Sequence, residues 1–215
     1  YLSTNANDSA PRTGGGVMTD AAGSNATTQI AYAPENWGIA VAYTYSSGEN
    51  GPGLYAANAT TKASDAFAAG VTNSYGVSAW WMPEESGLIP SISAGMGQSF
   101  TDAASATGSS TDINYESTSW YVGLEWDDAF IDGNSLGFAF GQPTWVSKVT
   151  GDDKVATTDY EDDPGYAFEV FYKFQVTDNI TVTPAVTLLT KPYSDTAADN
   201  EINALSGLVK TTFKF

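Results

Sequence analysis

The stretch LSGLVKTTFKF, residues 205–215, decides the fold. Successive side chains of a β-strand point to opposite faces, so Val209, Phe213 and Phe215 share one face while Lys210 and Lys214 share the other. A strand that is apolar on one face, cationic on the other and aromatic at its end is typical of an outer-membrane β-barrel, where lipid meets the apolar face and water the polar one. A soluble domain can also end on a buried edge strand, so the remaining sequence has to separate these two classes.

The composition of the 215 residues excludes several classes of function. The chain has no Cys and no His, which removes disulfides, thiolate nucleophiles, zinc sites and Ser–His–Asp triads. It has 25 acidic and 8 basic residues, and the net charge of −17 repels nucleic acid. We therefore expect no enzyme activity, no cofactor and no nucleic-acid partner. No run of about 18 apolar residues is present, so the sequence predicts no transmembrane helix.

Short runs rich in Val, Thr, Tyr, Phe and Trp predict an all-β, antiparallel fold, and no segment shows sustained helical periodicity. Most runs approach or exceed the roughly 9–11 residues that a tilted strand needs to cross hydrocarbon. Strands of ordinary proteins have about 5–6 residues. We expect strands at residues 27–33, 38–46, 73–82, 88–99, 115–126, 135–142, 165–176, 179–190 and 204–215, and the end of a further strand at Tyr1–Thr4.

The connections between these strands alternate between short and long. Outer-membrane barrels have short periplasmic turns and long external loops. The final strand follows a long loop, so the alternation places Phe215 at the periplasmic end. A soluble β-sandwich provides no reason for this pattern, and the sequence therefore favours a membrane barrel. The short connections are residues 34–37, 83–87, 127–134 and 177–178, and the long ones are residues 47–72, 100–114, 143–164 and 191–203.

Side-chain alternation assigns an outer and an inner face to each strand. The predicted lipid-facing residues are Val170, Tyr172, Val182, Val186, Val209 and Phe213. The predicted lumen-facing residues are Glu125, Glu169, Lys173, Thr181, Thr183 and Lys210. Aromatic residues near strand ends predict interfacial girdles at Trp37, Tyr45, Trp80, Trp81, Trp126, Phe130, Phe213 and Phe215.

Three further features carry specific expectations. Phe213 and Phe215 form the expected signal that the membrane-insertion machinery reads. Pro184 lies inside a predicted strand, and its missing N–H predicts a local bulge. The loop 143–164 carries two acidic clusters, which could bind calcium through carboxylate oxygens or could simply be solvated. Their spacing matches no EF-hand loop, and we assign no metal site to their residues, Asp152, Asp153, Glu161, Asp162 and Asp163.

The stretches IAYAPENWGIAVAYTY (30–45), YGVSAWWMPEESGLIPSISAGMG (75–97) and FEVFYKFQVTDNITVTPAV (168–186) resemble cyanobacterial OprB-type porins. Porins of this type carry an amino-terminal periplasmic domain that binds the cell wall, followed by a barrel. The resemblance implies a diffusion channel, commonly a homotrimer, with about sixteen strands per subunit. Residues 1–215 would then be the carboxyl-terminal portion of one barrel domain, with no second domain in the chain. The chain begins without a start Met or a leader, so we expect a processed product or a fragment.

The function predicted is passive diffusion of ions and small hydrophilic solutes through a water-filled barrel in the cell outer membrane, without anion preference. The expected partners are outer-membrane lipid, two further copies of the chain in a homotrimer, the permeating solutes and ions, and the cell wall through a missing amino-terminal domain. The resemblance also implies carbohydrate transport, but the family's sugar selectivity rests on lumen Arg and aromatic residues. The single Arg here, Arg12, lies in a predicted loop, so that selectivity is not carried over.

Other classes of protein remain open from the sequence. The main alternative is a secreted or surface β-protein, such as an adhesin or a calcium-dependent binding module, without a pore. A closed ten-stranded barrel satisfies the same loop alternation. An enzyme is the weakest candidate, because acid pairs such as Asp127-Asp128 and Glu84-Glu85 are adjacent in predicted turns and point apart.

Overall fold

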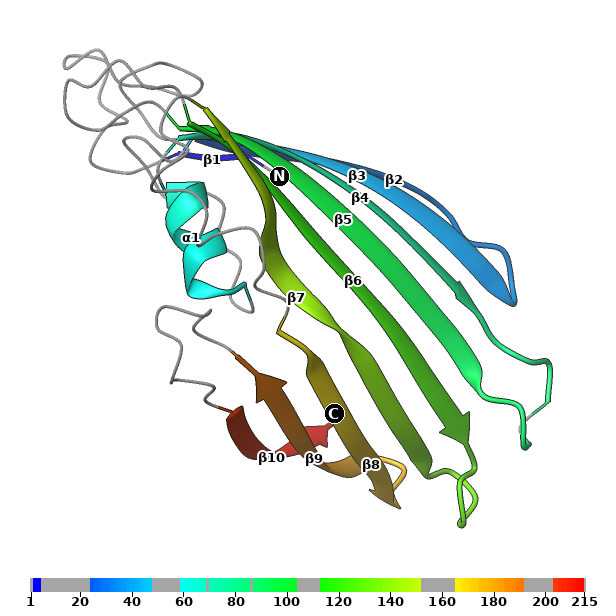
Figure 1. Ribbon diagram of the computed structural model, residues 1–215. Coiled ribbons are helices and arrows are strands. Elements are labelled where there is room, and N and C mark those ends of the chain that lie inside the picture. The colour runs from blue at the N-terminus through cyan, green and yellow to red at the C-terminus, as the bar shows by residue number, and fades with distance from the viewer. Residues whose placement is uncertain are drawn as a thin grey trace.

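The computed structural model describes residues 2–4, 24–47, 59–68, 70–85, 87–103, 113–151, 165–191 and 203–214, which form ten strands and one helix (Figure 1). The strands are β1 (Leu2–Thr4), β2 (Ser24–Tyr32), β3 (Trp37–Ser47), β4 (Val71–Trp81), β5 (Ser91–Ala103), β6 (Ile113–Asp127), β7 (Ser135–Gly151), β8 (Ala167–Thr177), β9 (Ile180–Thr190) and β10 (Asn203–Phe213). The helix is α1 (Thr61–Ala68).

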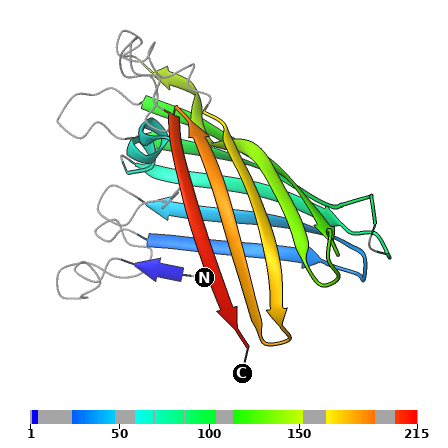
Figure 2. The same ribbon diagram turned by 90° about the horizontal axis from the view of Figure 1, so that it is seen from below.

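Each strand pairs antiparallel with the next one along the chain, which gives a single curved sheet in the order β1 to β10 (Figure 2). The predicted all-β antiparallel fold is confirmed, and each predicted strand corresponds to a strand of the structure. The sheet formed by the described residues is open, because β1 and β10 are not neighbours in it. These residues therefore do not form the closed ten-stranded barrel that the sequence had left open.

The register sorts the side chains of the sheet into two faces, because directly opposite residues of antiparallel strands point the same way. Small polar residues line one face, as in the row formed by Thr44, Ser74, Ser99 and Ser117 of β3 to β6. Large apolar residues line the other, as in the row formed by Val41, Val77, Met96 and Trp120. We call these the polar face and the apolar face.

The apolar face is uncovered. Ile30, Leu205 and Val209 are 71%, 74% and 67% exposed. A soluble domain buries such residues, and in a β-sandwich two apolar faces would pack against each other. No second sheet covers this face in the described part of the chain. Buried apolar side chains of the described residues are instead confined to the small cluster of Ala63, Ala66, Phe67, Val146 and Val149, at the helix.

The helix α1 was not predicted, since residues 47–72 were expected to be loop. Its apolar residues Ala63, Ala66 and Phe67 recur with helical spacing, but over too few turns to count as sustained periodicity. They pack on Val146 and Val149 of β7. The register places these two valines on the polar face, so α1 lies against that face (Figure 1).

Strand β7 extends further than predicted. The expected strand ended at residue 142, because Pro143 cannot donate a hydrogen bond to the sheet. The strand in fact continues to Gly151. The register shifts at the proline, so that Pro143 and Thr144 together lie opposite Ser119. In such a bulge a residue is released from the ladder of hydrogen bonds, which is why the strand tolerates proline at this position.

The bulge predicted at Pro184 is wrong. The register between β9 and β10 passes through the pair Pro184 and Val209 without a shift. On the β8 side the pairing is interrupted beside Pro184 and resumes in the same register, and the shift between these strands lies at Gln175–Thr177. The missing N–H therefore removes a ladder hydrogen bond without inserting a residue.

The predicted alternation of loop lengths holds only in part. Strand β5 runs from Ser91 to Ala103 rather than over 88–99, so the connections 82–90 and 104–112 are equally long. The antiparallel order still gathers the connections before β3, β5, β7 and β9 at one end of the sheet. The carboxyl end of β10 lies at this same end, which we call the turn end (Figure 2).

Hydrogen bonds fasten the turn end. In the β8–β9 turn, Asn179 donates from Nδ2 to the Lys214 carbonyl at 2.8 Å, and its own carbonyl accepts from the Lys214 N–H at 2.9 Å. In the β6–β7 turn, the buried Asn134 donates to the Tyr172 hydroxyl at 3.1 Å and accepts from the Gln175 N–H at 2.9 Å. The Tyr172 hydroxyl donates in turn to the Ala129 carbonyl at 2.6 Å. Both turns are thereby attached to strands other than those they connect.

Replacing Asn134 with Ala should destabilise the sheet by about 1–3 kcal/mol, because it leaves the partly buried Gln175 N–H without its acceptor. The measurement is the urea midpoint of the protein folded in lipid vesicles. The matched control is Asp132→Ala, an exposed position in the same turn that should leave the midpoint unchanged. Equal midpoints for the two variants would contradict this account of the turn.

Candidate functional site

The candidate site is the concave side of the sheet, which the polar face lines. A cavity of about 860 Å³ lies along this side, and its lining includes Ala40, Ser78, Gly95, Ser119, Glu169 and Thr187. The lining spans strands β2 to β10 and includes Ala59, two residues before α1. Short side chains on this face keep the space open, because glycine, alanine and serine project little beyond the backbone.

Hydroxyl groups of the polar face bond to one another across neighbouring strands. Thr27 and Thr44 approach to 2.9 Å and Thr72 and Thr101 to 2.9 Å, while Ser74 and Ser99 approach to 2.8 Å. Each pair satisfies its hydrogen bonds within the wall and strengthens the cross-strand contact. In this part of the wall the polar character comes from uncharged hydroxyl groups.

Three aromatic rings on the polar face lie against glycines of the neighbouring strand. A Cβ added at these glycines would overlap the ring, so glycine is what allows each ring to lie close to the wall. The ring therefore takes up less of the space on the concave side than it would if it stood upright. The pairs are Tyr121 with Gly95, Phe171 with Gly137, and Trp80 with Gly38.

Trp80 was predicted to belong to an interfacial girdle, and this prediction is wrong. The register sets Trp80 opposite Gly38 and Ser93, on the polar face, and its neighbour Trp81 on the apolar face. Two adjacent tryptophans in one strand must point to opposite sides, and the sequence alone did not show which of them pointed outward.

The predicted lumen-facing residues all lie on the polar face. Lys173 Nζ lies 3.9 Å from Glu125 Oε1, and the Thr187 hydroxyl donates to Glu169 Oε2 at 3.1 Å. The register sets Thr183 opposite Lys210 and Thr181 opposite Thr212 on the same face. That this face contacts water in a lumen stays a prediction.

The predicted lipid-facing residues all lie on the apolar face. The pairs Val170 with Val186 and Val182 with Thr211 define their register, and Tyr172, Val209 and Phe213 follow the same parity. Their contact with lipid stays a prediction. Its physical basis is the exposure of the large apolar residues on this face.

Aromatic residues mark two levels on the apolar face. Near the turn end, Tyr32 and Trp37 stack edge to face with centroids 5.6 Å apart. The opposite end of the strands is the loop end. Towards it, the ring centroid of Tyr75 lies 5.3 Å from that of Tyr43 and 6.3 Å from that of Phe100. Aromatic rings gather at both interfaces of a membrane, where one edge is apolar and the other wet. Two such levels on one face are consistent with an apolar band bounded by two interfaces.

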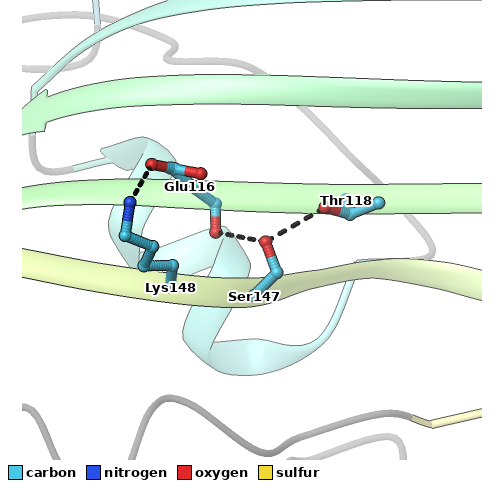
Figure 3. A network of polar contacts seen from close by, with 4 residues as sticks. All are labelled: Glu116, Thr118, Ser147 and Lys148. Atoms are coloured by element: carbon cyan, nitrogen blue, oxygen red, sulfur yellow. Dashed lines mark hydrogen bonds and ion pairs between the residues drawn. The ribbon is translucent and has the colours of Figure 1, made fainter.

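Charged residues appear on the apolar side of the sheet at the level of Phe100, which lies directly opposite Glu116. Lys148 Nζ lies 2.7 Å from Glu116 Oε1 (Figure 3). Ser147 donates to the Glu116 carbonyl at 3.1 Å and approaches the Thr118 hydroxyl to 3.0 Å (Figure 3). This network lies between β6 and β7 at their loop end, where the apolar band has ended.

Several predicted residues lie outside the described part of the chain. They are Phe215 and the acidic residues Asp152, Asp153, Glu161, Asp162 and Asp163. Among the residues that are described, no group of three or more acidic side chains could hold a metal ion. The one helix within the described ranges, α1, is far shorter than a membrane-spanning helix.

A curved antiparallel sheet with an uncovered apolar face and a polar concave face defines the class of transmembrane β-barrels. The chain belongs to the OprB family of carbohydrate-selective porins, because the family model matches residues 36–215. The recognition of this family from the sequence is thereby confirmed. It is a family of non-enzymatic channels, generally located in the outer membrane.

Two cyanobacterial proteins are similar to the chain. An uncharacterized protein of Nostoc sp. (strain PCC 7120) is 32% identical over 145 residues, which are 67% of this chain and 22% of that protein. An uncharacterized protein of Synechocystis sp. (strain PCC 6803) is 30% identical over 107 residues, which are 48% of this chain and 18% of that protein. The chain thus spans about a fifth of the length of these curated relatives. No solved structure matches it.

The two faces can be tested at neighbouring positions of β9. Replacing Val182 with Arg should destabilise the folded protein by about 2–4 kcal/mol near the bilayer midplane, because the charge would enter lipid. Thr183→Arg, the matched control on the polar face, should destabilise the folded protein less. The measurement is the urea midpoint in vesicles.

Chemical labelling provides a second readout of the same assignment. In the Cys-free chain, Val182→Cys should react with a lipid-soluble reagent and Thr183→Cys with a water-soluble one. The reverse pattern would show that the register of β9 is wrong.

Proposed function

We propose that this chain forms part of the wall of an outer-membrane porin, through which ions and small hydrophilic solutes diffuse passively. The observation that carries the proposal is the pairing of an exposed apolar face with a concave polar face in one sheet. Membership of the OprB family supports the same class of function. The carbohydrate selectivity in the family's name is a further candidate property of the whole protein.

The open edges of the sheet support a larger barrel. Every N–H and C=O in hydrocarbon needs a partner, and each unpaired group costs several kcal/mol. The outer edges of β1 and β10 have no strand beside them in the described part. We therefore infer that further strands complete the barrel, and the much greater length of the relatives leaves room for them and for a cell-wall-binding domain. A homotrimer is the assembly that we propose.

The alternative of a soluble surface β-protein explains less. An adhesin or a binding module would need to bury the apolar face against another layer, and the described residues supply none. A protein of this kind would stay in solution without detergent. Extraction that requires detergent, followed by stepwise conductance in a planar bilayer, would support the porin. A detergent-free soluble protein without conductance would contradict it.

Deleting Phe213–Phe215 should abolish insertion into the outer membrane. Phe213 ends β10, and Asn179 holds the backbone of Lys214 against the β8–β9 turn. The measurement is the amount of folded protein in outer-membrane fractions, read from its heat-modifiable migration on gels. The matched control is Asn179→Ala, which loses one side-chain hydrogen bond and should still insert. Normal insertion of the truncated protein would count heavily against the barrel.

The channel should favour cations, or at least not favour anions. The physical reason is the net charge of −17, since fixed negative charge raises the local concentration of cations at an entrance. Salt screens the effect over about 8–10 Å near physiological strength, so the preference should fade as salt is added. The measurement is the reversal potential under a salt gradient, first at low and then at high ionic strength. Anion preference at low salt would overturn the prediction.

A further inference from the structure

The helix α1 is fastened to the concave wall at its start. The Thr60 N–H donates to the Thr144 carbonyl of β7 at 2.9 Å. Thr60, which is 3% exposed, also accepts a hydrogen bond from the Ala63 N–H through its side-chain oxygen at 3.3 Å, as an N-cap residue does. Thr144 belongs to the bulge around Pro143, where the ladder between β6 and β7 is displaced. The bulge thus provides the acceptor that holds the first turn of the helix.

The apolar side of α1 packs against the same strand, β7. Phe67 is 1% exposed and packs with Ala63 and Ala66 on Val146 and Val149. Burial of these side chains removes apolar area from water and fixes the rotation of the helix about its axis. The helix is consequently a fixed part of the inner wall.

This rotation directs Asp65 away from the wall. Successive helical residues are separated by about 100°, so position 65 lies nearly opposite the side formed by Ala63, Ala66 and Phe67. Asp65 and Ser64 are exposed, as that geometry requires. Within the described residues no basic group lies within 4 Å of the Asp65 carboxylate, and the side chain of Lys62 is not described.

The other charged residues on the polar face lie elsewhere and partly offset one another. Glu125 is 3.9 Å from Lys173, and both lie towards the turn end. Glu169 accepts a hydrogen bond from Thr187, and Lys210 lies on β10. Asp65 is therefore a carboxylate that the described structure holds on the exposed side of α1, against the polar face.

We infer that Asp65 is a determinant of ion selectivity, a carboxylate that the wall-bound helix α1 holds in the path of permeating cations. The inference rests on the proposed porin function, and it assigns the charge preference to one residue rather than to the net charge of the chain. A fixed carboxylate in a narrow aqueous path with low-dielectric walls attracts cations and repels anions.

The test is reversal potential in planar bilayers with the full-length protein and potassium chloride. Asp65→Asn should lower the cation-to-anion permeability ratio by about two-fold at low salt and leave insertion unchanged. Asp65→Lys should shift the ratio further in the same direction. The matched control is Asp132→Asn, which removes the same charge from an exposed position in the β6–β7 turn and should leave the ratio unaltered.

A second variant tests whether the helix must be bound to the wall. Phe67→Ala removes the side chain that seals α1, so Asp65→Asn should have a smaller effect on the permeability ratio in that background than in the native one. A conducting channel whose ratio is equal in native protein and Asp65→Asn would overturn the inference while leaving the porin intact. A native protein that does not conduct at all would overturn the proposed function itself.

Discussion

Backbone hydrogen bonding between neighbouring strands is the constraint on which this structure depends. In the hydrocarbon core of a membrane no water is present to hydrogen-bond an unpaired N–H or C=O group. A sheet that crosses the core must therefore pair every strand on both sides. The continuous antiparallel order from β1 to β10 meets that demand between neighbouring strands, and it leaves the outer edges of β1 and β10 unpaired in the described part. Where the ladder is broken, the break is local. Beside Pro184 the pairing stops and resumes in register, and at Pro143 one additional residue is set aside in a bulge.

The same ladder determines what each face can do. Because side chains alternate strictly, shifting the register of a strand by one residue would move all of its side chains to the opposite face. Apolar residues such as Val41 and Val77 are thereby committed to the exposed face, and Thr44 and Ser74 to the concave one. Aromatic rings on the concave side lie close to the sheet because they lie over glycines, as Tyr121 does over Gly95, and the space on this side stays open. An open polar interior and an apolar exterior are two consequences of one register.

The sequence was sufficient for the strands and their faces, because both depend on a local period of two residues. It identified the alternation around Val182 and Thr183 that the register reproduces. It failed where a nonlocal contact decides the outcome. Strand β7 passes Pro143 because the bulge is opposite β6, and α1 is helical because β7 offers Val146 and Val149 to its short apolar side. The sequence did not show which of Trp80 and Trp81 faces outward. The pairing of Trp80 with Gly38 places Trp80 on the polar face and Trp81 on the apolar face.

The unpredicted helix α1 and the unpredicted extension of β7 are physically one feature. Had β7 ended at residue 142, nothing would present the Thr144 carbonyl to Thr60, nor Val146 and Val149 to Phe67. Pro143, where the sequence predicted the strand to end, lies in the bulge whose Thr144 carbonyl accepts the hydrogen bond from Thr60. Irregularity concentrates where a fold positions functional groups. The position of Asp65 on the concave side therefore depends on the irregular part of β7, which holds α1.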